Sequence, residues 1–279
     1  PKKSGKYHTL KDYALLPGIL TGIFLMVALP LLSVNSANLR LLKAFNTDEY
    51  FVVGAIQCMF EQNTVIVNEC VPYVLNWPRF LFYLNLGAIY PALALASPNA
   101  QVFVLISRAV VVLFGSLSLL ATYVLGTRMF SWHVGLLAGL LTIATSTFLS
   151  LSLTVHPDIV QVFFVLLAIF FCYRLADSGK WQDLVMASVT AGIAFGCKLA
   201  GIFVLPLIVL ASLLFLSYRF RPCHPARWLV LARALATRTI IAAIAFSITF
   251  AALTPELLAD PRKLIMGFQR TAEKMATQG

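Results

Sequence analysis

Four ionisable residues in the sequence have the side chains that acid–base and phosphate chemistry requires. Asp48 and Glu49 are adjacent in FNTDEYFVVG, whereas Asp158 lies in SLTVHPDIVQVFF and Lys198 in GIAFGCKLAG. Each lies beside an apolar run, where an ionisable group is costly and is therefore a candidate for function. A carboxylate can remove a proton from a hydroxyl, and a cation can hold a phosphate that gains charge as it leaves. If the fold brings these residues together, they suit transfer of a group from a lipid phosphate.

Asp48, Asp158 and Lys198 each also have a purely structural interpretation, and Glu49 is expected to face water or to support a neighbour rather than to act directly. Asp48 would accept hydrogen bonds from the free N–H groups of a helix that starts at Glu49, and Asp158 would do the same for the next helix after Pro157. Lys198 would extend its ammonium group to the membrane surface. His156 fits both a turn position and a direct role. The two interpretations differ in one respect: only the functional one requires the residues to share one side of the membrane.

The composition is that of a membrane protein. Of 279 residues, 60% are hydrophobic and 11% are charged, against about 25% charged in soluble domains. The net charge is +10, but in a membrane protein the distribution of Lys and Arg along the chain matters more than their sum. We therefore expect no nucleic-acid partner.

Seven apolar runs are long enough to predict an all-α polytopic fold of about seven transmembrane helices. The predicted spans are Tyr13–Val34, Val102–Thr127, Trp132–Leu153, Ile159–Ala176, Leu184–Leu199, Ala200–Ser217 and Thr239–Leu253. An eighth run, Phe80–Ala96, is interrupted by Pro91. We expect one membrane domain over residues 1–279.

Positive charge decides whether the eighth run crosses the membrane. The basic N-terminus PKKSGKYHTLK and the arginine-rich loop 218–238 should both be cytoplasmic. They fall on the same side only if Phe80–Ala96 lies along the surface. Cytoplasmic segments then hold 12 of the 21 Lys and Arg residues. This topology brings Asp48, Asp158 and Lys198 to one outer face.

The outer face then carries a long loop, 35–101, and the start of a further segment, 254–279. Within the loop, DEYFVVGAIQCMF and NWPRFLFYLNLGAIYPALALA predict two interfacial helices. Cys58 and Cys70 share this loop, and both a disulfide and free thiols fit their spacing. No Cys or His spacing indicates a metal site, although two outer carboxylates could hold a divalent metal.

Six segments are similar, in order and spacing, to motifs of one known group: TDEYFVVGAIQCMFEQN, NWPRFLFYL, SRAVVVLFGSLSLLATYVLGTRMFSWHVGLLAGLL, LTVHPDIVQVFFVLLAIFF, AGIAFGCKLAGIFVLPLIVLASLL and LTPELLADPRKLIMGF. The chain thus resembles lipid-carrier-dependent glycosyltransferases of the GT-C fold, related to protein O-mannosyltransferases and aminoarabinose transferases. The resemblance covers nearly the whole chain.

The resemblance implies an inverting glycosyltransferase that moves a sugar from a polyprenyl-phosphate carrier to an acceptor on the outer face. It implies that Asp48 is the general base, that Asp158 is the second acid of the site, and that Lys198 is a phosphate-binding or site-organising cation. Further residues are expected to contact substrate or to support the site: Glu49, Tyr50, Arg79, Arg108 and His156. A bacterial inner membrane, with a cytoplasmic N-terminus, is the expected location.

The sequence departs from the family pattern at several positions. Cys197 and Leu199 replace Thr and Tyr around the lysine, and Trp77 and Phe51 replace cations of aminoarabinose transferases. Arg79 could substitute for one of them. These changes argue against aminoarabinose transfer, and they leave the sugar and the acceptor open.

Two functions other than an enzyme also fit the sequence. The chain ends soon after the last span, so it is expected to be a partial chain or a reduced core module. A catalytically silent, glycosyltransferase-like subunit that packs against other membrane subunits fits this observation. A transporter is less favoured, because no internal repeat and no mid-span charge is evident.

Overall fold

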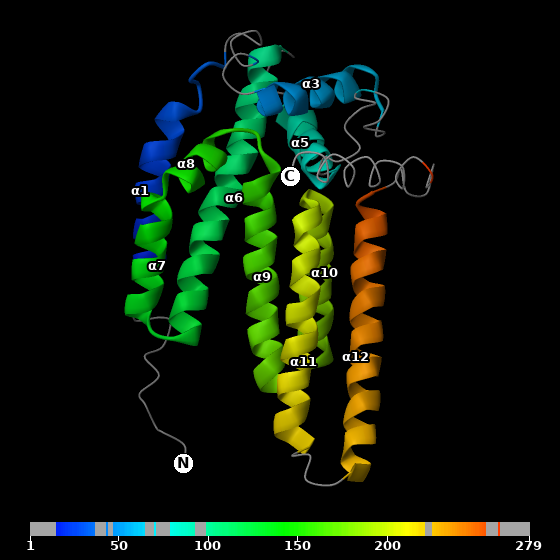
Figure 1. Cartoon of the computed structure of the whole chain (residues 1–279). Coiled ribbons are helices and arrows are strands. Elements are labelled where there is room, and N and C mark those ends of the chain that lie inside the picture. The colour runs from blue at the N-terminus through cyan, green and yellow to red at the C-terminus, as the bar shows by residue number, and fades with distance from the viewer. Residues whose placement is uncertain are drawn as a thin grey trace, which may run out of the picture.

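The computed structural model describes residues 15–36, 43, 47–64, 70, 79–92, 99–220, 225–254 and 262, and the regular structure in these ranges is entirely helical. The expected all-α polytopic fold is confirmed, because apolar helices stand side by side as a bundle (Figure 1). The upright helices are α1 (Leu15–Leu31), α6 (Ala100–Met129), α7 (Trp132–Ala144), α9 (Pro157–Ser178), α10 (Trp181–Cys197), α11 (Leu205–Phe220) and α12 (Pro225–Ala252).

All seven predicted spans contain helix, but their lengths differ. Within the described residues, four helices are long and apolar enough to cross a membrane: α6, α9, α11 with the preceding 3₁₀ turn η2 (Leu199–Val204), and α12. A fifth results if α7 and the following α8 (Ser146–Leu153) form one bent span. Helices α1 and α10 have 17 residues each, fewer than the roughly 20 that a straight span needs.

Two predicted segments differ from the structure. The run Trp132–Leu153 is not one straight helix, because it breaks at Thr145 into α7 and α8, which are bent by 67°. The segment 218–238, predicted as a loop, is helical from Pro225 onward. Proline fits the first turn of a helix, where its missing N–H is not needed. Most of the predicted segment 254–279 lies outside the described residues.

Side-chain packing joins the upright helices into one bundle. Helix α10 packs against α9 and α12, and α6 packs against α7, α9 and α1. The close approach of α6 and α7 requires glycine, because a Cβ at Gly126 would lie 2.7 Å from the Cα of Gly135. Small residues of this kind let two helix backbones approach closely.

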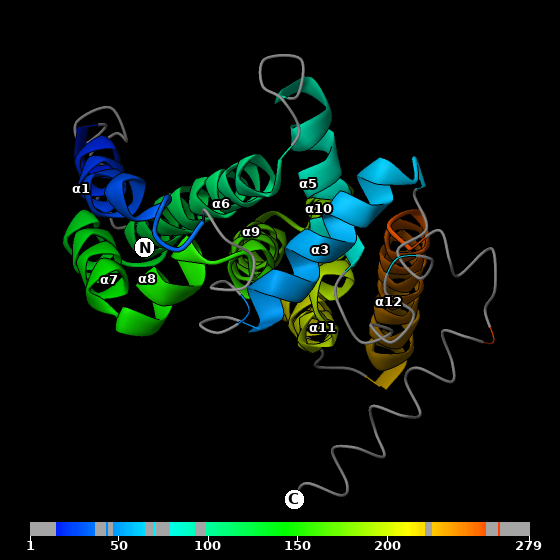
Figure 2. The ribbon, with the colours of Figure 1, turned by 90° about the horizontal axis from the view of Figure 1, so that it is seen from above.

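Two helices lie across one end of the bundle, which we call the upper end as in Figure 1. They are α3 (Thr47–Glu61) and α5 (Arg79–Ala92), and Figure 2 shows both crossing above the upright helices. The junctions α8–α9 and α10–η2 lie at the same end, whereas the turns α6–α7 and α9–α10 lie at the lower end (Figure 1). The fold therefore brings α3 and both of these junctions together.

Candidate functional site

Helix α3 carries two acids whose environments differ. Asp48 and Glu49 both lie in the first turn of α3, where negative charge stabilises the helix dipole. The side chain of Asp48 is 55% exposed, whereas that of Glu49 is 1% exposed. The helix begins at Thr47, so Asp48 is inside the first turn and does not cap a helix that starts at Glu49.

Glu49 is the centre of a buried network. Arg108 of α6 donates from Nε to Oε1 at 2.7 Å and from Nη2 to Oε2 at 2.9 Å. The N–H of Val155 donates to Oε1 at 3.1 Å. The remaining Arg108 nitrogen, Nη1, donates to the carbonyls of Leu32 and Val34 at 2.8 and 2.6 Å. This network joins α3 to α6, to the chain after α1 and to the α8–α9 junction.

Of the two roles expected from the sequence, the burial of Glu49 and Arg108 fits support of the site better than contact with substrate, and it differs from the expectation that Glu49 faces water. Both charges are satisfied by fixed partners, and a fully paired network makes a site rigid. Glu49 therefore sets the position of α3, and with it the position of the neighbouring Asp48.

A second group of charged residues lies open at the upper end. Lys198 Nζ is 2.6 Å from Asp158 Oδ1, and His156 Nδ1 is 2.7 Å from Asp158 Oδ2. The other ring nitrogen of His156, Nε2, is 3.6 Å from Asp48 Oδ2. The four side chains form a continuous row, which we call the carboxylate row: Asp48, His156, Asp158 and Lys198.

Local sequence explains how the carboxylate row is held. Pro157 occupies the first turn of α9, which places His156 at the N-cap and Asp158 in the first turn. Lys198 ends α10 in an extended conformation before the chain turns into η2. The carbonyl of Lys198 accepts a hydrogen bond of 2.9 Å from Gln161 Nε2. Sequence reasoning missed Gln161, although it is the one polar residue in the run IVQVFFVLLAIFF.

Of three other residues considered in the sequence, the structure describes the side chain of Tyr50 but not those of Arg79 and Trp77. Tyr50 is half-buried in α3, and the Lys43 ammonium lies 5.5 Å from the centre of its ring. Arg79 is the first residue of α5, but its side chain lies outside the described part of the structure. Trp77 also lies outside the described residues. The structure therefore adds nothing to the predicted substrate contact of Arg79.

A disulfide links Cys58 of α3 to Cys70. The sequence had left this pairing open. Within the described ranges, no group of three or more His, Cys, Asp or Glu residues is arranged to hold a metal ion. The divalent metal considered from the sequence stays a prediction.

Chemically, the carboxylate row offers a base and a cation to one ligand. The Asp48 carboxylate is mostly exposed, so it can approach a hydroxyl group. Lys198 is 47% exposed, and its ammonium group has three N–H donors. One of these donors points to Asp158. The remaining donors can face a phosphate.

One of the comparisons with known proteins identifies a family for the chain. The family model described as dolichyl-phosphate-mannose-protein mannosyltransferase matches residues 89–253, which is more than half of the chain. The matched range includes Asp158 and Lys198, and it lies beyond α3 and Asp48. No curated protein and no solved structure matches the chain.

Proposed function

Because the chain belongs to the dolichyl-phosphate-mannose-protein mannosyltransferase family, we propose that it is an inverting glycosyltransferase with a polyprenyl-phosphate sugar as donor. The carboxylate row at the upper end of the bundle is the proposed active site. The observation that carries the proposal is the exposed Asp48 carboxylate, connected through His156 to the Asp158–Lys198 pair.

The proposed reaction is a single displacement. The Asp48 carboxylate removes the proton of an acceptor hydroxyl, and the hydroxyl oxygen attacks the anomeric carbon of the sugar. The bond between that carbon and the phosphate oxygen breaks, and the polyprenyl phosphate leaves with the electron pair. Attack from the face opposite the phosphate inverts the configuration of the sugar. General-base assistance of this kind contributes roughly 10²–10⁴-fold to a rate.

The other members of the carboxylate row have supporting roles in this proposal. Lys198 stabilises the negative charge that develops on the departing phosphate, as fixed cations do at transferring phosphate groups. Asp158 holds the Lys198 ammonium at 2.6 Å. His156 lies between the two carboxylates and orients them.

The disulfide supports the proposal that the upper end of the bundle lies outside the cytoplasm. Disulfides persist in oxidising compartments and are rare in the cytosol. The Cys58–Cys70 bond lies on α3, the helix that carries Asp48. We therefore place the upper end, and the acceptor, on the outer side of the membrane.

The test is the substitution Asp48→Asn, which keeps the size of the side chain and removes the base. The protein is reconstituted into vesicles with polyprenyl-phosphate-linked radiolabelled mannose, chosen from the family description, and an acceptor membrane-protein fraction. We expect transfer to fall by about 10³-fold, within the range for loss of a general base. The exposed acid Glu61, at the other end of α3, offers the matched control Glu61→Gln.

Unchanged transfer by the Asp48→Asn protein would exclude Asp48 as the base. A wild-type protein that releases no polyprenyl phosphate with any sugar carrier would favour the alternative of a silent structural subunit.

A further inference from the structure

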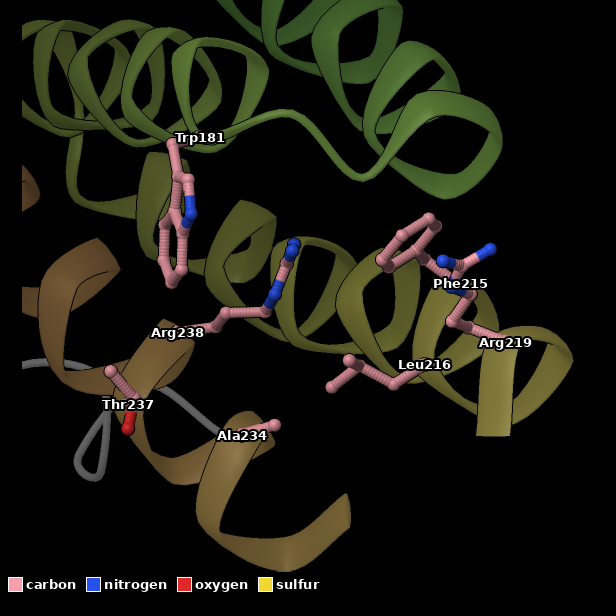
Figure 3. A pocket seen from close by; sticks show the side chains of 7 residues that line it. All are labelled: Trp181, Phe215, Leu216, Arg219, Ala234, Thr237 and Arg238. Carbon is pink, nitrogen blue, oxygen red and sulfur yellow. The ribbon is translucent and has the colours of Figure 1, made fainter. Parts of the chain in front are cut away.

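A pocket at the lower end of the bundle lies between α10, α11 and α12, away from the carboxylate row. Figure 3 shows the residues that line it: Trp181, Phe215, Leu216, Arg219, Ala234, Thr237 and Arg238. The lining contains two arginines and no acidic residue. The proposed glycosyl transfer uses none of these side chains.

Arg238 is the most constrained of these residues. It is 6% exposed, and its Nη2 donates a hydrogen bond of 2.7 Å to the carbonyl of Gly179. Its guanidinium lies between two aromatic rings, 4.7 Å from the ring centre of Trp181 and 5.0 Å from that of Phe215 (Figure 3). Stacking of this kind suits the flat, delocalised guanidinium group.

One nitrogen of Arg238 lacks a hydrogen bond. Nη1 is buried, and it has no hydrogen-bond partner in the part of the chain that the structure describes. A buried donor that is left unpaired costs free energy, and the cost is higher when the donor is charged. The fold therefore holds a positive donor ready for an acceptor that the described protein atoms do not supply.

The α9–α10 turn contacts two of the residues that line the pocket, Arg238 and Phe215. Gly179 ends α9 with a φ of 65°, a left-handed conformation that favours glycine. A Cβ at this position would also run into the ring of Phe215. The turn, the ring and the hydrogen bond to Arg238 therefore form one preassembled unit.

Arg219 adds a second positive charge at the mouth of the pocket. It lies in the last turn of α11 and is exposed. Trp181 is also about half exposed, which is typical of tryptophan at a membrane–water boundary. The pocket is thus lined by one exposed and one buried arginine, and both carry the N–H donors that bind phosphate groups.

We propose that this pocket binds a phosphate group, carried by an anionic lipid headgroup or by a soluble phosphate ester. Arg238 Nη1 and the Arg219 guanidinium donate to the phosphate oxygens, and rotation of the half-exposed Trp181 ring admits the phosphate. In a lipid, the carbon chain beyond the phosphate continues along Phe215 and Leu216. The proposal does not depend on the proposed sugar transfer.

Thermal unfolding of the full chain in a neutral detergent tests this site. Phosphatidylglycerol, phosphatidylcholine and glycerol 1-phosphate are added separately at equal concentrations. A ligand that binds only the folded protein raises the Tm, and we expect phosphatidylglycerol to raise it by about 4 °C. The variant Arg219→Gln should bind phosphatidylglycerol about tenfold more weakly, since one charged hydrogen-bonding partner is lost.

The matched control is Arg233→Gln, an exposed arginine of α12 that does not line the pocket. It should keep the full rise in Tm. Arg238→Lys keeps the charge and a donor for Gly179, but it loses the planar group, so it should also bind phosphatidylglycerol weakly. If this variant does not fold, Arg219→Gln still decides the test.

Stabilisation by phosphatidylglycerol alone identifies a lipid site, and equal stabilisation by glycerol 1-phosphate identifies a site for soluble phosphate esters. Both results support the proposal. An equal response to phosphatidylcholine and phosphatidylglycerol overturns it. So does a full response to phosphatidylglycerol in Arg219→Gln.

Discussion

The carboxylate row and the Glu49–Arg108 pair lie at the same end of the bundle and contain the same kinds of charged group. They differ in exposure and in the number of partners. Every oxygen and nitrogen of the Glu49–Arg108 ion pair has a fixed neighbour within the protein. The carboxylate row instead leaves Asp48 mostly exposed and Lys198 half exposed.

This contrast explains how two adjacent acids acquire different roles. A buried ion pair is expensive to break, because the remaining charge has lost both water and its partner. An exposed carboxylate loses little when it is replaced, and it is free to meet a ligand. Asp48 and Glu49 are neighbours in sequence, but consecutive positions of a helix point in different directions.

The largest expected effect is on folding, from Glu49→Ala. Removing this carboxylate leaves Arg108 buried without its charge partner, which costs about 3–5 kcal/mol. Denaturant unfolding in detergent micelles measures the loss. The matched change Asp48→Ala, at the exposed neighbour, should alter stability by within about 0.5 kcal/mol.

A double variant sharpens this prediction. Replacing both buried charges, as Glu49→Leu with Arg108→Met, removes the unpaired charge and should recover much of the stability that Glu49→Ala loses. If Glu49→Ala and Asp48→Ala lose equal stability, the distinction between the buried pair and the carboxylate row is wrong.

A smaller effect is expected on activity from Lys198→Met, below that of Asp48→Asn. Loss of a fixed donor to a developing negative charge lowers the rate by roughly 10²-fold, whereas a half-exposed ion pair contributes about 1 kcal/mol or less to stability. Rates of sugar transfer and unfolding curves of the same preparations separate the two effects. Lys180→Met, an exposed lysine after α9 at the lower end, is the control and should leave transfer unchanged.

The smallest effect is expected from His156→Phe, which keeps the ring volume and removes both nitrogens. In the proposed reaction His156 positions the two carboxylates and does not react, so transfer should fall about tenfold, less than the general-base range. His133→Phe, an exposed histidine of α7, serves for comparison. A loss as large as that of Asp48→Asn would show that His156 is itself the base.

The helical, membrane-spanning fold followed from the sequence because long apolar runs have few alternatives in a bilayer. Their ends were harder to predict. Thr145 breaks a continuous apolar run into α7 and α8, and α12 continues below its apolar part to Pro225. Hydropathy reports the length of an apolar segment but does not register a bend within it or a polar helical turn beyond it.

For the candidate site, the sequence predicted the members and the side of the membrane that they share, but not the contacts between them. Counting helix crossings and positive charges predicted that Asp48, Asp158 and Lys198 share one side, because membrane topology alternates with each span. The position of His156 in the same turn as Asp158 predicts that it lies near this carboxylate.

The fold class and the ionisable residues of the candidate site could be predicted from the sequence, because they depend on composition and on the order of apolar and charged segments. The packing of the helices set which acid is exposed, and it paired Glu49 with Arg108, 59 residues away. It also decided that Arg238, assigned from the sequence to a loop, is a buried helical residue. These outcomes depend on contacts between distant helices, and local sequence does not specify such contacts.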